Sequence, residues 1–206
     1  MAEWSCSGLQ IRVRRFDSGL SLQLFNYKLR SALFLDRDGV INVDHGYVHK
    51  IKEFDFNPDI FNLVREANLK KYLVIIITNQ AGIGRGFFSE EDFHNLMDWV
   101  LERFKNEKAK VDDIYFCPFH PLYGKGIYKR KSNLRKPNPG MIIKAAKDYD
   151  ICLESSILVG DKLSDIKAGL AAGVGKNILL NPSEDTSGLG KKLHIVNELK
   201  YVQKFL

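Results

Sequence analysis

Short, continuously apolar segments alternate along most of this chain with segments of helical period. The apolar runs are residues 32–35, 72–77 and 157–159. Strands buried on both faces of a parallel sheet read as continuous apolar runs, whereas the helices that connect them repeat every three or four residues. The alternation therefore predicts an α/β fold with a central parallel sheet.

Helix start and stop signals lie between these runs. Asn57–Pro58, Ser89 and Asn138–Pro139 each resemble the N-terminal cap of a helix, and Gly173 resembles the left-handed end of a helix over residues 163–172. We further expect a closing helix at residues 197–206. The expected buried faces are Ile60, Leu63, Val64 and Ala67; Phe93, Leu96, Met97, Val100, Leu101 and Phe104; and Leu199, Val202 and Phe205.

Composition fits one globular domain but does not choose its partner. The chain has 206 residues, of which 45% are hydrophobic and 27% charged, with a net charge of +6. This charge suits a nucleic-acid binder, a membrane-surface binder or an enzyme for anionic small molecules. Three widely spaced cysteines argue against a disulfide framework and favour the cytoplasm. No apolar run approaches the roughly 20 residues that span a bilayer, so a soluble protein is expected.

The first thirty residues differ from the rest of the chain. They contain no secretory hydrophobic region, and Glu3 and Asp17 argue against a transit peptide. We expect residues 1–30 to be an extension of unknown role, and residues 31–206 to form the globular domain. An arm that supplies a strand or a dimer contact is the alternative.

Polar side chains follow the expected strands at the edge where α/β proteins bind ligands. Asp36 and Asp38 follow the first strand, Thr78 follows the second, and Asp161 follows the strand near residue 157. Lys136 precedes the third helix and can reach the same edge. Ligands bind beyond the carboxyl ends of parallel strands, so the four groups together predict a site there.

The motifs DRDGVIN, TNQ, RKP and GDKLSD, in this order and spacing, resemble those of the haloacid dehalogenase superfamily of phosphohydrolases. The longer stretches at residues 36–48, 78–86 and 135–141 resemble its heptose bisphosphate phosphatases, which are related to histidinol-phosphatases. The resemblance covers roughly residues 31–200. It implies a Rossmann-like three-layer sandwich without a large cap domain. It also implies Mg²⁺-dependent removal of the C7 phosphate of heptose bisphosphate, a cytoplasmic step in lipopolysaccharide biosynthesis.

The residue types supply the chemistry of phosphate monoester hydrolysis. Asp36 is the expected nucleophile and forms an aspartyl-phosphate. Asp38 lies on the same side, because strand geometry repeats every two residues, and is the expected general acid and base. An acid must keep its proton near neutral pH, so a raised pKa is required of Asp38, and a neighbouring carboxylate could provide it.

Cations complete the expected catalytic set. Asp36, Asp161 and the backbone carbonyl of Asp38 are the expected Mg²⁺ ligands. Thr78 and Lys136 are expected to stabilise the transferring phosphoryl group. Asp165 is either an outer-shell residue that orients the site or a helix N-terminal acid favoured by the dipole.

Substrate contacts follow from the resemblance alone. It implies that a loop over the sugar is formed by Asp44, His45, Gly46 and Tyr47. It also implies that the phosphate site is extended by Asn79, Gln80 and Ala81, and that the substrate is contacted by Arg135 and Lys162. The segment between Asp113 and Asp148 has no acidic residue, which suits a doubly phosphorylated ligand. A solvated loop is the alternative, and we favour it for residues 129–131.

The segment CPFHPLYGKGIYKRKSNLRKPNPG raises the question of a structural zinc site. Zinc-bearing relatives carry four ligands at positions that here read Cys117, Phe119, Ser132 and Leu134. Three ligands are missing and His120 is one residue out of register, so we predict that zinc is absent. Packing by Tyr123 and Tyr128 is expected to hold the loop instead.

Other functions remain open at this point. A histidinol-phosphatase is the nearest, followed by another small phosphomonoester phosphatase, a nucleic-acid 3′-phosphatase and a phospho-receiver domain. The receiver needs an adjacent acidic pair before its aspartate and has no use for Asp38. The sequence offers no evident duplex-binding module. We therefore expect a monomer whose partner is a small sugar bisphosphate, with neither nucleic acid nor membrane as a partner.

Overall fold

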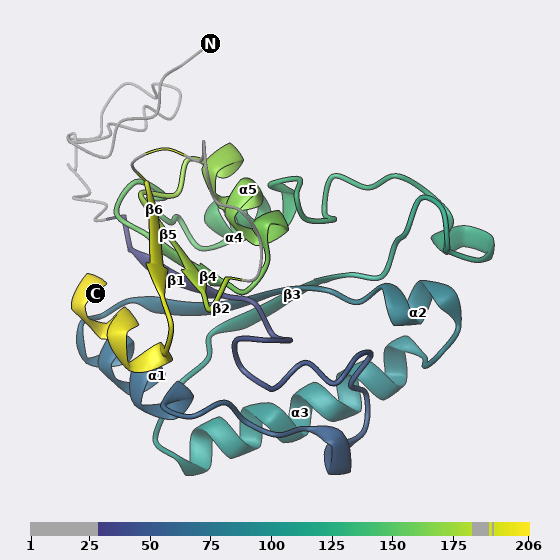
Figure 1. Cartoon of the computed structure of the whole chain (residues 1–206), viewed down its shortest axis with the longest axis horizontal. Helices are drawn as coiled ribbons and strands as arrows, with labels where there is room; N and C mark the ends of the chain where they lie inside the picture. Colours follow the sequence, from purple (N-terminus) through teal and green to yellow (C-terminus); the bar gives the residue numbers. More distant parts are fainter. Residues whose placement is uncertain (1–28, 183–189, 191) are drawn as a thin grey trace, which may run out of the picture.

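The computed structural model describes residues 29–182, 190 and 192–206, so nearly all of the N-terminal extension lies outside the described residues. Six parallel strands form one sheet in the order β3-β2-β1-β4-β5-β6 (Figure 1). The strands are β1 Ala32–Leu35, β2 Leu73–Asn79, β3 Asp113–Cys117, β4 Ile157–Gly160, β5 Lys176–Leu180 and β6 Leu193–Val196. This is the strand order of a doubly wound α/β fold, as predicted.

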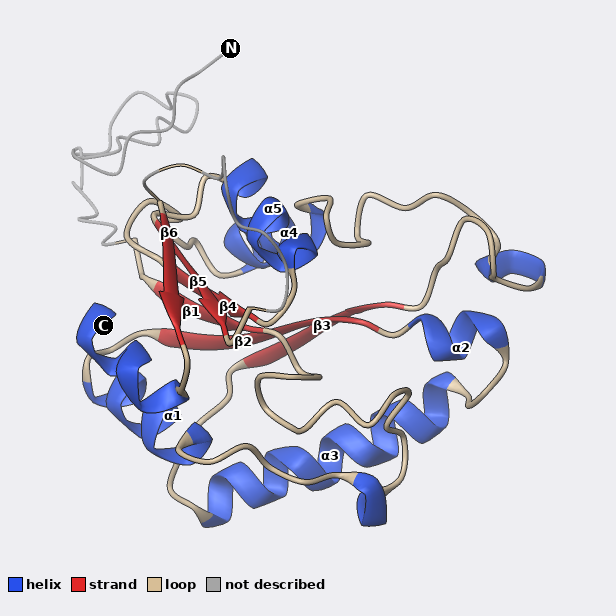
Figure 2. Ribbon diagram, viewed as in Figure 1, coloured by secondary structure: helices blue, strands red, loops and turns tan. Residues whose placement is uncertain are grey.

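Helices cover both faces of the sheet (Figure 2). The helices are α1 Ile60–Leu69, α2 Ala81–Arg85, α3 Glu90–Asn106, α4 Gly140–Asp148 and α5 Leu163–Ala172. Short 3₁₀ helices are η1 Ile51–Glu53, η2 Gly126–Tyr128 and η3 Leu199–Phe205. Leu33 and Leu35 pack in one core with α1 and α3, whereas Ala32 and Phe34 pack in the other with α4 and α5. Because strand side chains alternate, both faces of β1 are buried, which explains its continuous apolar run.

The helix boundaries agree with the sequence in two places. Ser89 Oγ accepts a hydrogen bond from the Asp92 amide at 3.0 Å, and the Asp92 carboxylate accepts one from the Ser89 amide at 2.8 Å. This reciprocal pair is the predicted cap of α3. Gly173 ends α5 with a φ of 88°, in the left-handed region where glycine is favoured.

Two other boundary predictions were wrong. Helix α1 begins at Ile60, and the Asn57 side chain donates instead to the carbonyls of Gly39 and Val40, both at 3.0 Å. Asn138 donates to the Ser132 carbonyl rather than capping α4. Side chains suited to helix caps are equally suited to loops, so tertiary contacts decide between the two. The expected closing helix is present as the 3₁₀ helix η3, which buries Leu199 and Val202 and packs the partly buried Phe205 against the core.

Within the described residues, no helix combines the length and apolar character needed to cross a membrane.

Candidate active site

Four distant segments meet at the carboxyl edge of the sheet around Lys136. Its ammonium lies 2.8 Å from Asp36 Oδ1 and 2.7 Å from Asp165 Oδ1, and it donates to the Ile77 carbonyl at 2.9 Å. Lys136, Asp36 and Asp165 are all nearly inaccessible to solvent. Burial by itself would lower the pKa of Lys136, but the carboxylates of Asp165 and Asp36 raise it on balance, so the ammonium stays charged.

The acidic residues around Lys136 outnumber the available cation. One oxygen from each of Asp36, Asp161 and Asp165 lies within 4.8 Å of the other two. Burial raises the pKa of Asp36 to about 8 despite the attraction of Lys136, and the neighbouring Asp165 and Asp161 add to the rise. Burial also raises the pKa of Asp161 to about 6. Asp161 Oδ1 is buried without a hydrogen-bond partner among the described residues.

This donor set fits a hard divalent cation. Mg²⁺ prefers oxygen ligands. Among the described residues, Lys136 alone lies between the buried Asp36 and Asp165, and the partly buried Asp161 has only Lys162 Nζ at 3.8 Å from its Oδ2, so a cation would find incompletely compensated carboxylates here. The predicted ligands Asp36 and Asp161 lie together as expected. For Asp165 the sequence left two roles open, a residue that orients the site and an acid at a helix N-terminus, and its contacts fit both. It pairs with Lys136, and its Oδ2 accepts a hydrogen bond from the Lys162 amide at the start of α5 at 3.0 Å.

The turn after β1, residues 36–39, lies directly against Asp161 at the end of β4. Gly39 has a φ of +90°, and a Cβ atom there would lie 2.2 Å from Asp161 Oδ2. Only glycine satisfies both the left-handed backbone and the contact with the carboxylate. The turn therefore brings the aspartates that follow β1 up to the one that follows β4.

A buried arginine that we did not predict as a site residue holds Asp38. Arg37 is completely buried, and its Nη2 lies 2.6 and 2.8 Å from the two carboxylate oxygens of Asp38. Asn42 and Gln80 also donate to Asp38, at 3.2 and 3.1 Å. The nearest charged partner of Asp38 is thus a guanidinium rather than the neighbouring carboxylate that we had considered. The alternation of side chains along a strand gave no indication in the sequence that the Arg37 side chain is buried.

The residues at the carboxyl end of β2 and Gln80 after it organise the site through their side-chain amides. Gln80 Nε2 donates to Thr78 Oγ1 at 2.9 Å and thus links Thr78 to Asp38. Asn79 pairs with the backbone of Lys136 in both directions, each hydrogen bond being 3.1 Å long. In this structure the Asn79 amide therefore positions Lys136. Ala81 is the first residue of α2 and is partly exposed.

Part of the predicted substrate loop faces the site. Lys162 Nζ lies 2.8 Å from Asp44 Oδ2, which joins the loop after β1 to the start of α5. Asp44 also accepts a hydrogen bond from the Gly46 amide at 3.0 Å. His45 instead pairs with Asp55, and both side chains are largely exposed. Tyr47 lies beside Arg85 of α2, with the guanidinium carbon 5.5 Å from its ring centroid.

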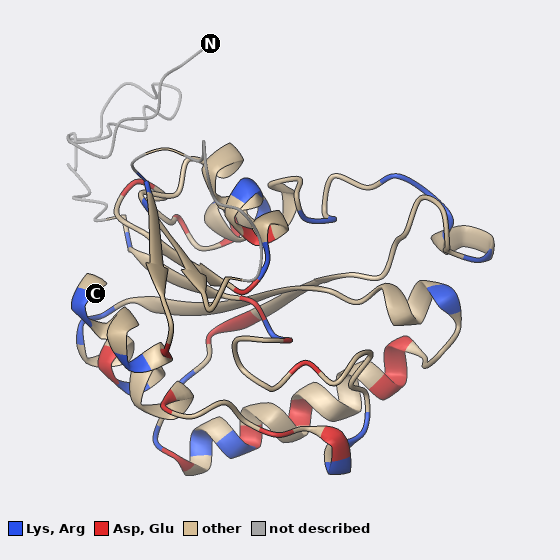
Figure 3. Ribbon diagram, in the orientation of Figure 1, with Lys and Arg blue, Asp and Glu red and all other residues tan. Residues whose placement is uncertain are grey.

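The long connection between β3 and α4 carries several basic residues and no acidic one (Figure 3). It is held by rings and hydrogen bonds. Arg130 stacks 3.9 Å from the centroid of Phe119, and the Tyr128 hydroxyl donates to Glu90 at 2.9 Å. Tyr123 packs against His120 with ring centroids 4.8 Å apart. Tyr123 and Tyr128 therefore pack in the loop as predicted.

The two possible zinc ligands of this loop, Cys117 and His120, lie in environments that disfavour metal binding. Cys117 is fully buried, and burial raises the pKa of its thiol, which disfavours the thiolate that binds metal. His120 Nδ1 accepts hydrogen bonds from the amides of Leu122 and Tyr123, at 3.2 and 3.1 Å. These contacts support the prediction that this loop does not need zinc.

Metal analysis of the purified chain should find no stoichiometric zinc. We expect the melting temperature in excess Mg²⁺ to be the same before and after treatment with a zinc chelator, because rings rather than metal hold the loop. One tightly held zinc per chain, lost in Cys117→Ser, would contradict this expectation.

Stabilisation by Mg²⁺ should depend on pH. Because the pKa values of Asp36 and Asp161 are raised in the folded protein, their contribution to folding stability is fully present below the ordinary pKa of 3.8. It is lost as pH rises through about 6 for Asp161 and about 8 for Asp36. Protons also compete with a bound cation. The increase in melting temperature on adding Mg²⁺ should therefore be larger at pH 8.5 than at pH 5.5.

The matched controls for this measurement are two Asp→Asn changes. Asp161→Asn should remove most of the Mg²⁺ effect, whereas Asp98→Asn, on the exposed side of α3, should preserve it. Equal stabilisation at both pH values, or full stabilisation in Asp161→Asn, would argue against the cation site.

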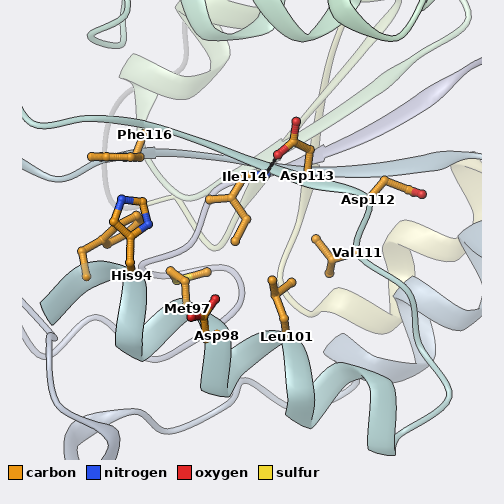
Figure 4. A pocket seen from close by; sticks show the side chains of 10 residues that line it. His94, Met97, Asp98, Leu101, Val111, Asp112, Asp113, Ile114 and Phe116 are labelled. Carbon is orange, nitrogen blue, oxygen red and sulfur yellow. Dashed lines mark hydrogen bonds between the residues drawn. The ribbon is translucent and has the colours of Figure 1, made fainter. Parts of the chain in front are cut away.

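A separate groove lies on the edge of the sheet between α3 and β3 (Figure 4). It has a volume of about 280 Å³ and is lined by Met97, Leu101 and Ile114, among others. Leu101, predicted to lie in the core, faces this groove and is only partly buried. Asp113 begins β3, so the groove extends to the amino end of that strand, whereas the carboxylate site lies beyond the carboxyl ends.

Sequence comparisons relate the chain to bacterial phosphatases. Residues 133–184 match the HAD-hydrolase-like family. The D-glycero-alpha-D-manno-heptose-1,7-bisphosphate 7-phosphatase of Burkholderia mallei is 56% identical over 149 residues, which are 72% of this chain and 79% of that protein. The D-glycero-beta-D-manno-heptose-1,7-bisphosphate 7-phosphatase of Vibrio cholerae is 43% identical over 81% of this chain and 90% of its own length.

Solved structures show the same fold. A HAD-like phosphatase from Mesorhizobium loti has a TM-score of 0.79 and 33% identity over 86% of each chain. The D,D-heptose 1,7-bisphosphate phosphatase of B. bronchiseptica, complexed with magnesium and phosphate, has a TM-score of 0.73 and 28% identity over 84% of this chain and 96% of that one. The chain therefore belongs to the haloacid dehalogenase superfamily and, within it, to the family of the D-glycero-D-manno-heptose-1,7-bisphosphate 7-phosphatases.

Proposed function

We propose that this chain is a Mg²⁺-dependent phosphatase that removes the C7 phosphate of D-glycero-D-manno-heptose 1,7-bisphosphate. The observation that carries the proposal is the buried group in which Lys136 bridges Asp36 and Asp165 beside Asp161. Phosphoryl transfer depends mainly on positioning and on compensating charge, and this group supplies both. The named activity of relatives up to 56% identical supports this choice of substrate.

The first half of the reaction uses both aspartates of the turn after β1. A carboxylate oxygen of Asp36 attacks phosphorus, and the bond between phosphorus and the C7 oxygen breaks. The electron pair of that bond stays on the C7 oxygen, which takes a proton from Asp38. Heptose 1-phosphate leaves, and Asp36 carries the phosphoryl group.

Hydrolysis of the aspartyl-phosphate completes the cycle. Asp38, now a carboxylate, removes a proton from water as the water oxygen attacks phosphorus. The bond between phosphorus and the Asp36 oxygen then breaks, which releases inorganic phosphate and restores both side chains. The hydrogen bonds from Arg37, Asn42 and Gln80 hold Asp38 in one orientation for both proton transfers.

Thr78 and Lys136 stabilise the phosphoryl oxygens as charge moves onto them. Asn79 keeps Lys136 in place through its paired hydrogen bonds with the Lys136 backbone. Asp36, Asp161 and the backbone carbonyl of Asp38 are the groups that would hold Mg²⁺, whose charge screens the repulsion between the carboxylate and the phosphate.

The loop contacts support a phosphorylated polyol as substrate. Asp44 and Lys162 form an exposed ion pair at the site, and Tyr47 and Arg135 lie near Arg85, which favours a ligand with both hydroxyl and anionic groups. A histidinol-phosphate phosphatase is the second candidate, because it would use the same catalytic residues. We further propose a cytoplasmic monomer.

Phosphate release from three substrates tests the proposal. The assay compares both anomers of heptose 1,7-bisphosphate with histidinol phosphate in Mg²⁺, with Asp36→Asn as the blank. We expect kcat/KM to be highest for a heptose bisphosphate, and the α anomer is the first choice because the relative at 56% identity is named for it. Preference for histidinol phosphate, or equally poor rates on all three, would reject the heptose assignment and keep the phosphatase chemistry.

A further inference from the structure

The loop after β1 contains a turn whose backbone is unusual for its sequence. Gly46 and Tyr47 have φ values of 79° and 53°. Glycine adopts this left-handed region freely, whereas an aromatic residue is rarely found there unless its surroundings hold it. The Tyr47 side chain is 42% exposed, so burial of the ring does not account for this conformation. A contact to the backbone of Tyr47 is therefore expected.

The imidazole of His49 makes this contact. Its Nδ1 lies 2.8 Å from the carbonyl oxygen of Tyr47. A carbonyl oxygen can only accept, so Nδ1 carries the proton and donates it to the hydrogen bond. The Glu53 carboxylate lies 3.9 Å from the same nitrogen, which is beyond hydrogen-bond reach. The Tyr47 carbonyl is therefore the partner of Nδ1.

The ring of His49 is itself held by packing. It stacks on the buried ring of Phe88, with centroids 4.9 Å apart and an interplanar angle of 3°. Phe88 lies directly against α2, because a Cβ atom on Gly82 would be 2.2 Å from Phe88 Cε1. The same atom would be 3.0 Å from Tyr47 Cδ1. His49, Phe88 and Tyr47 thus form one packed group on α2.

The next residue of the loop connects this group to the proposed general acid. The Val48 carbonyl accepts a hydrogen bond at 2.7 Å from Arg37 Nη2, the atom that also binds the Asp38 carboxylate. Two consecutive carbonyls are therefore held, that of Tyr47 by His49 and that of Val48 by Arg37. Together these contacts fix the position of the loop relative to Asp38.

We propose that His49 is a positioning residue for the phosphatase reaction, which holds the Tyr47 carbonyl and thereby fixes the Tyr47 side chain against the sugar of the substrate. This inference rests on the proposed function. In this role His49 acts on binding of the sugar rather than on transfer of the phosphoryl group. Its loss should therefore raise KM more than it lowers kcat, and it should have little effect on a substrate without a sugar.

The first test is His49→Phe, which keeps an aromatic ring on Phe88 but removes the N–H donor. For heptose 1,7-bisphosphate we expect KM to rise about tenfold, as for the loss of one hydrogen bond, with kcat changed by no more than about threefold. The kcat/KM for p-nitrophenyl phosphate should also change by no more than about threefold. His94→Phe is the matched control, because His94 also packs against aromatic rings but lies on α3 beside Phe116, and it should behave as wild type.

Two amide variants separate the hydrogen bond from packing. The side-chain nitrogen of asparagine occupies the place of Nδ1, whereas that of glutamine lies nearer the place of Nε2. His49→Asn should therefore recover much of the affinity for the heptose bisphosphate, and His49→Gln should not. A role in packing alone would favour glutamine, whose size is closer to that of histidine. The melting temperature of each variant checks folding, and the comparison of asparagine with glutamine serves as the test if His49→Phe does not fold.

A double mutant tests whether His49 acts through Tyr47. In a Tyr47→Ala background the ring that His49 positions is missing, so adding His49→Phe should have little further effect on KM. A full additional effect of about tenfold in that background would show that His49 acts by another route.

Failure of this role and failure of the proposed function give different results. Equal losses on both substrates in His49→Phe, a loss in kcat alone, or no loss on either would overturn the role of His49 while the activity stands. If the wild-type chain does not hydrolyse the heptose bisphosphate, the proposed function fails. Hydrogen exchange of the amides of residues 44–48 then judges the inference. Exchange must be faster in His49→Phe and return towards the wild-type rate in His49→Asn for the inference to stand, and unchanged exchange would overturn it.

Discussion

Replacing Asp36 by asparagine should abolish turnover. Asparagine has nearly the shape of aspartate but lacks the charged oxygen that attacks phosphorus, and loss of a nucleophile costs at least ~10⁴-fold in rate. Asp36 is buried next to Asp161 and Asp165, and burial raises its pKa, so its charge is unfavourable in the free protein. We therefore expect Asp36→Asn to fold with a melting temperature near or above that of the wild type, as is common when a strained functional group is removed.

The measurement is phosphate release in Mg²⁺, together with the mass of the protein after brief exposure to substrate. Wild-type protein should show a transient gain of one phosphoryl group, and Asp36→Asn should show none. Asp98→Asn, the same change on the exposed side of α3, should have wild-type activity. Substantial turnover by Asp36→Asn would assign the nucleophile to another residue.

Replacing Asp38 by asparagine should lower kcat by about 10²- to 10⁴-fold, the usual contribution of a general acid and base. The amide keeps an oxygen that accepts hydrogen bonds from Arg37 and Asn42, but it has no acidic proton for the leaving group. The loss should therefore depend on the leaving group. It should be large for an alkyl phosphate such as the heptose bisphosphate and smaller for p-nitrophenyl phosphate, whose phenolate leaves without protonation.

Steady-state rates on the two substrates provide this comparison, and the phosphorylated fraction of the protein tests the second half of the reaction. With p-nitrophenyl phosphate, Asp38→Asn should accumulate the aspartyl-phosphate, because water is no longer deprotonated. An equal loss on both substrates without accumulation would show that Asp38 orients the site through Arg37 and Gln80 rather than transferring protons.

Local patterns in the sequence were sufficient for the layers of the fold. The apolar runs correspond to β1, β2 and β4, and the alternation of Leu33 and Leu35 with Ala32 and Phe34 distributes them between two cores. Capping chemistry was reliable for α3, where Ser89 and Asp92 satisfy each other within one turn. It was not reliable at Asn57 and Asn138, because their side chains bond to carbonyls of other segments.

The meeting of the proposed catalytic groups at one edge of the sheet was predictable for a topological reason. In a parallel sheet all carboxyl ends lie on one edge, so residues that follow different strands meet whatever their separation in the sequence. Asp36, Thr78 and Asp161 follow from this rule, and Lys136 joins them through a connection that returns to the same edge. The prediction that zinc is absent also comes from sequence, since a closed four-ligand site cannot form without its ligands.

The sequence by itself thus determined the parallel α/β architecture and which of the proposed catalytic groups meet at one edge of the sheet, because both depend on local periodicity and on which residues lie at the end of each strand. Only the tertiary structure decided how those groups are charged and held. The fold places Arg37 against Asp38 and brings Asp165 into contact with both Lys136 and the start of α5. It also buries Asp36 and much of Asp161, which raises the pKa of both carboxyl groups. It also stacks Arg85 against Tyr47 and Tyr123, which belong to two different loops. Such effects arise from desolvation and long-range proximity, which periodicity along one chain does not encode.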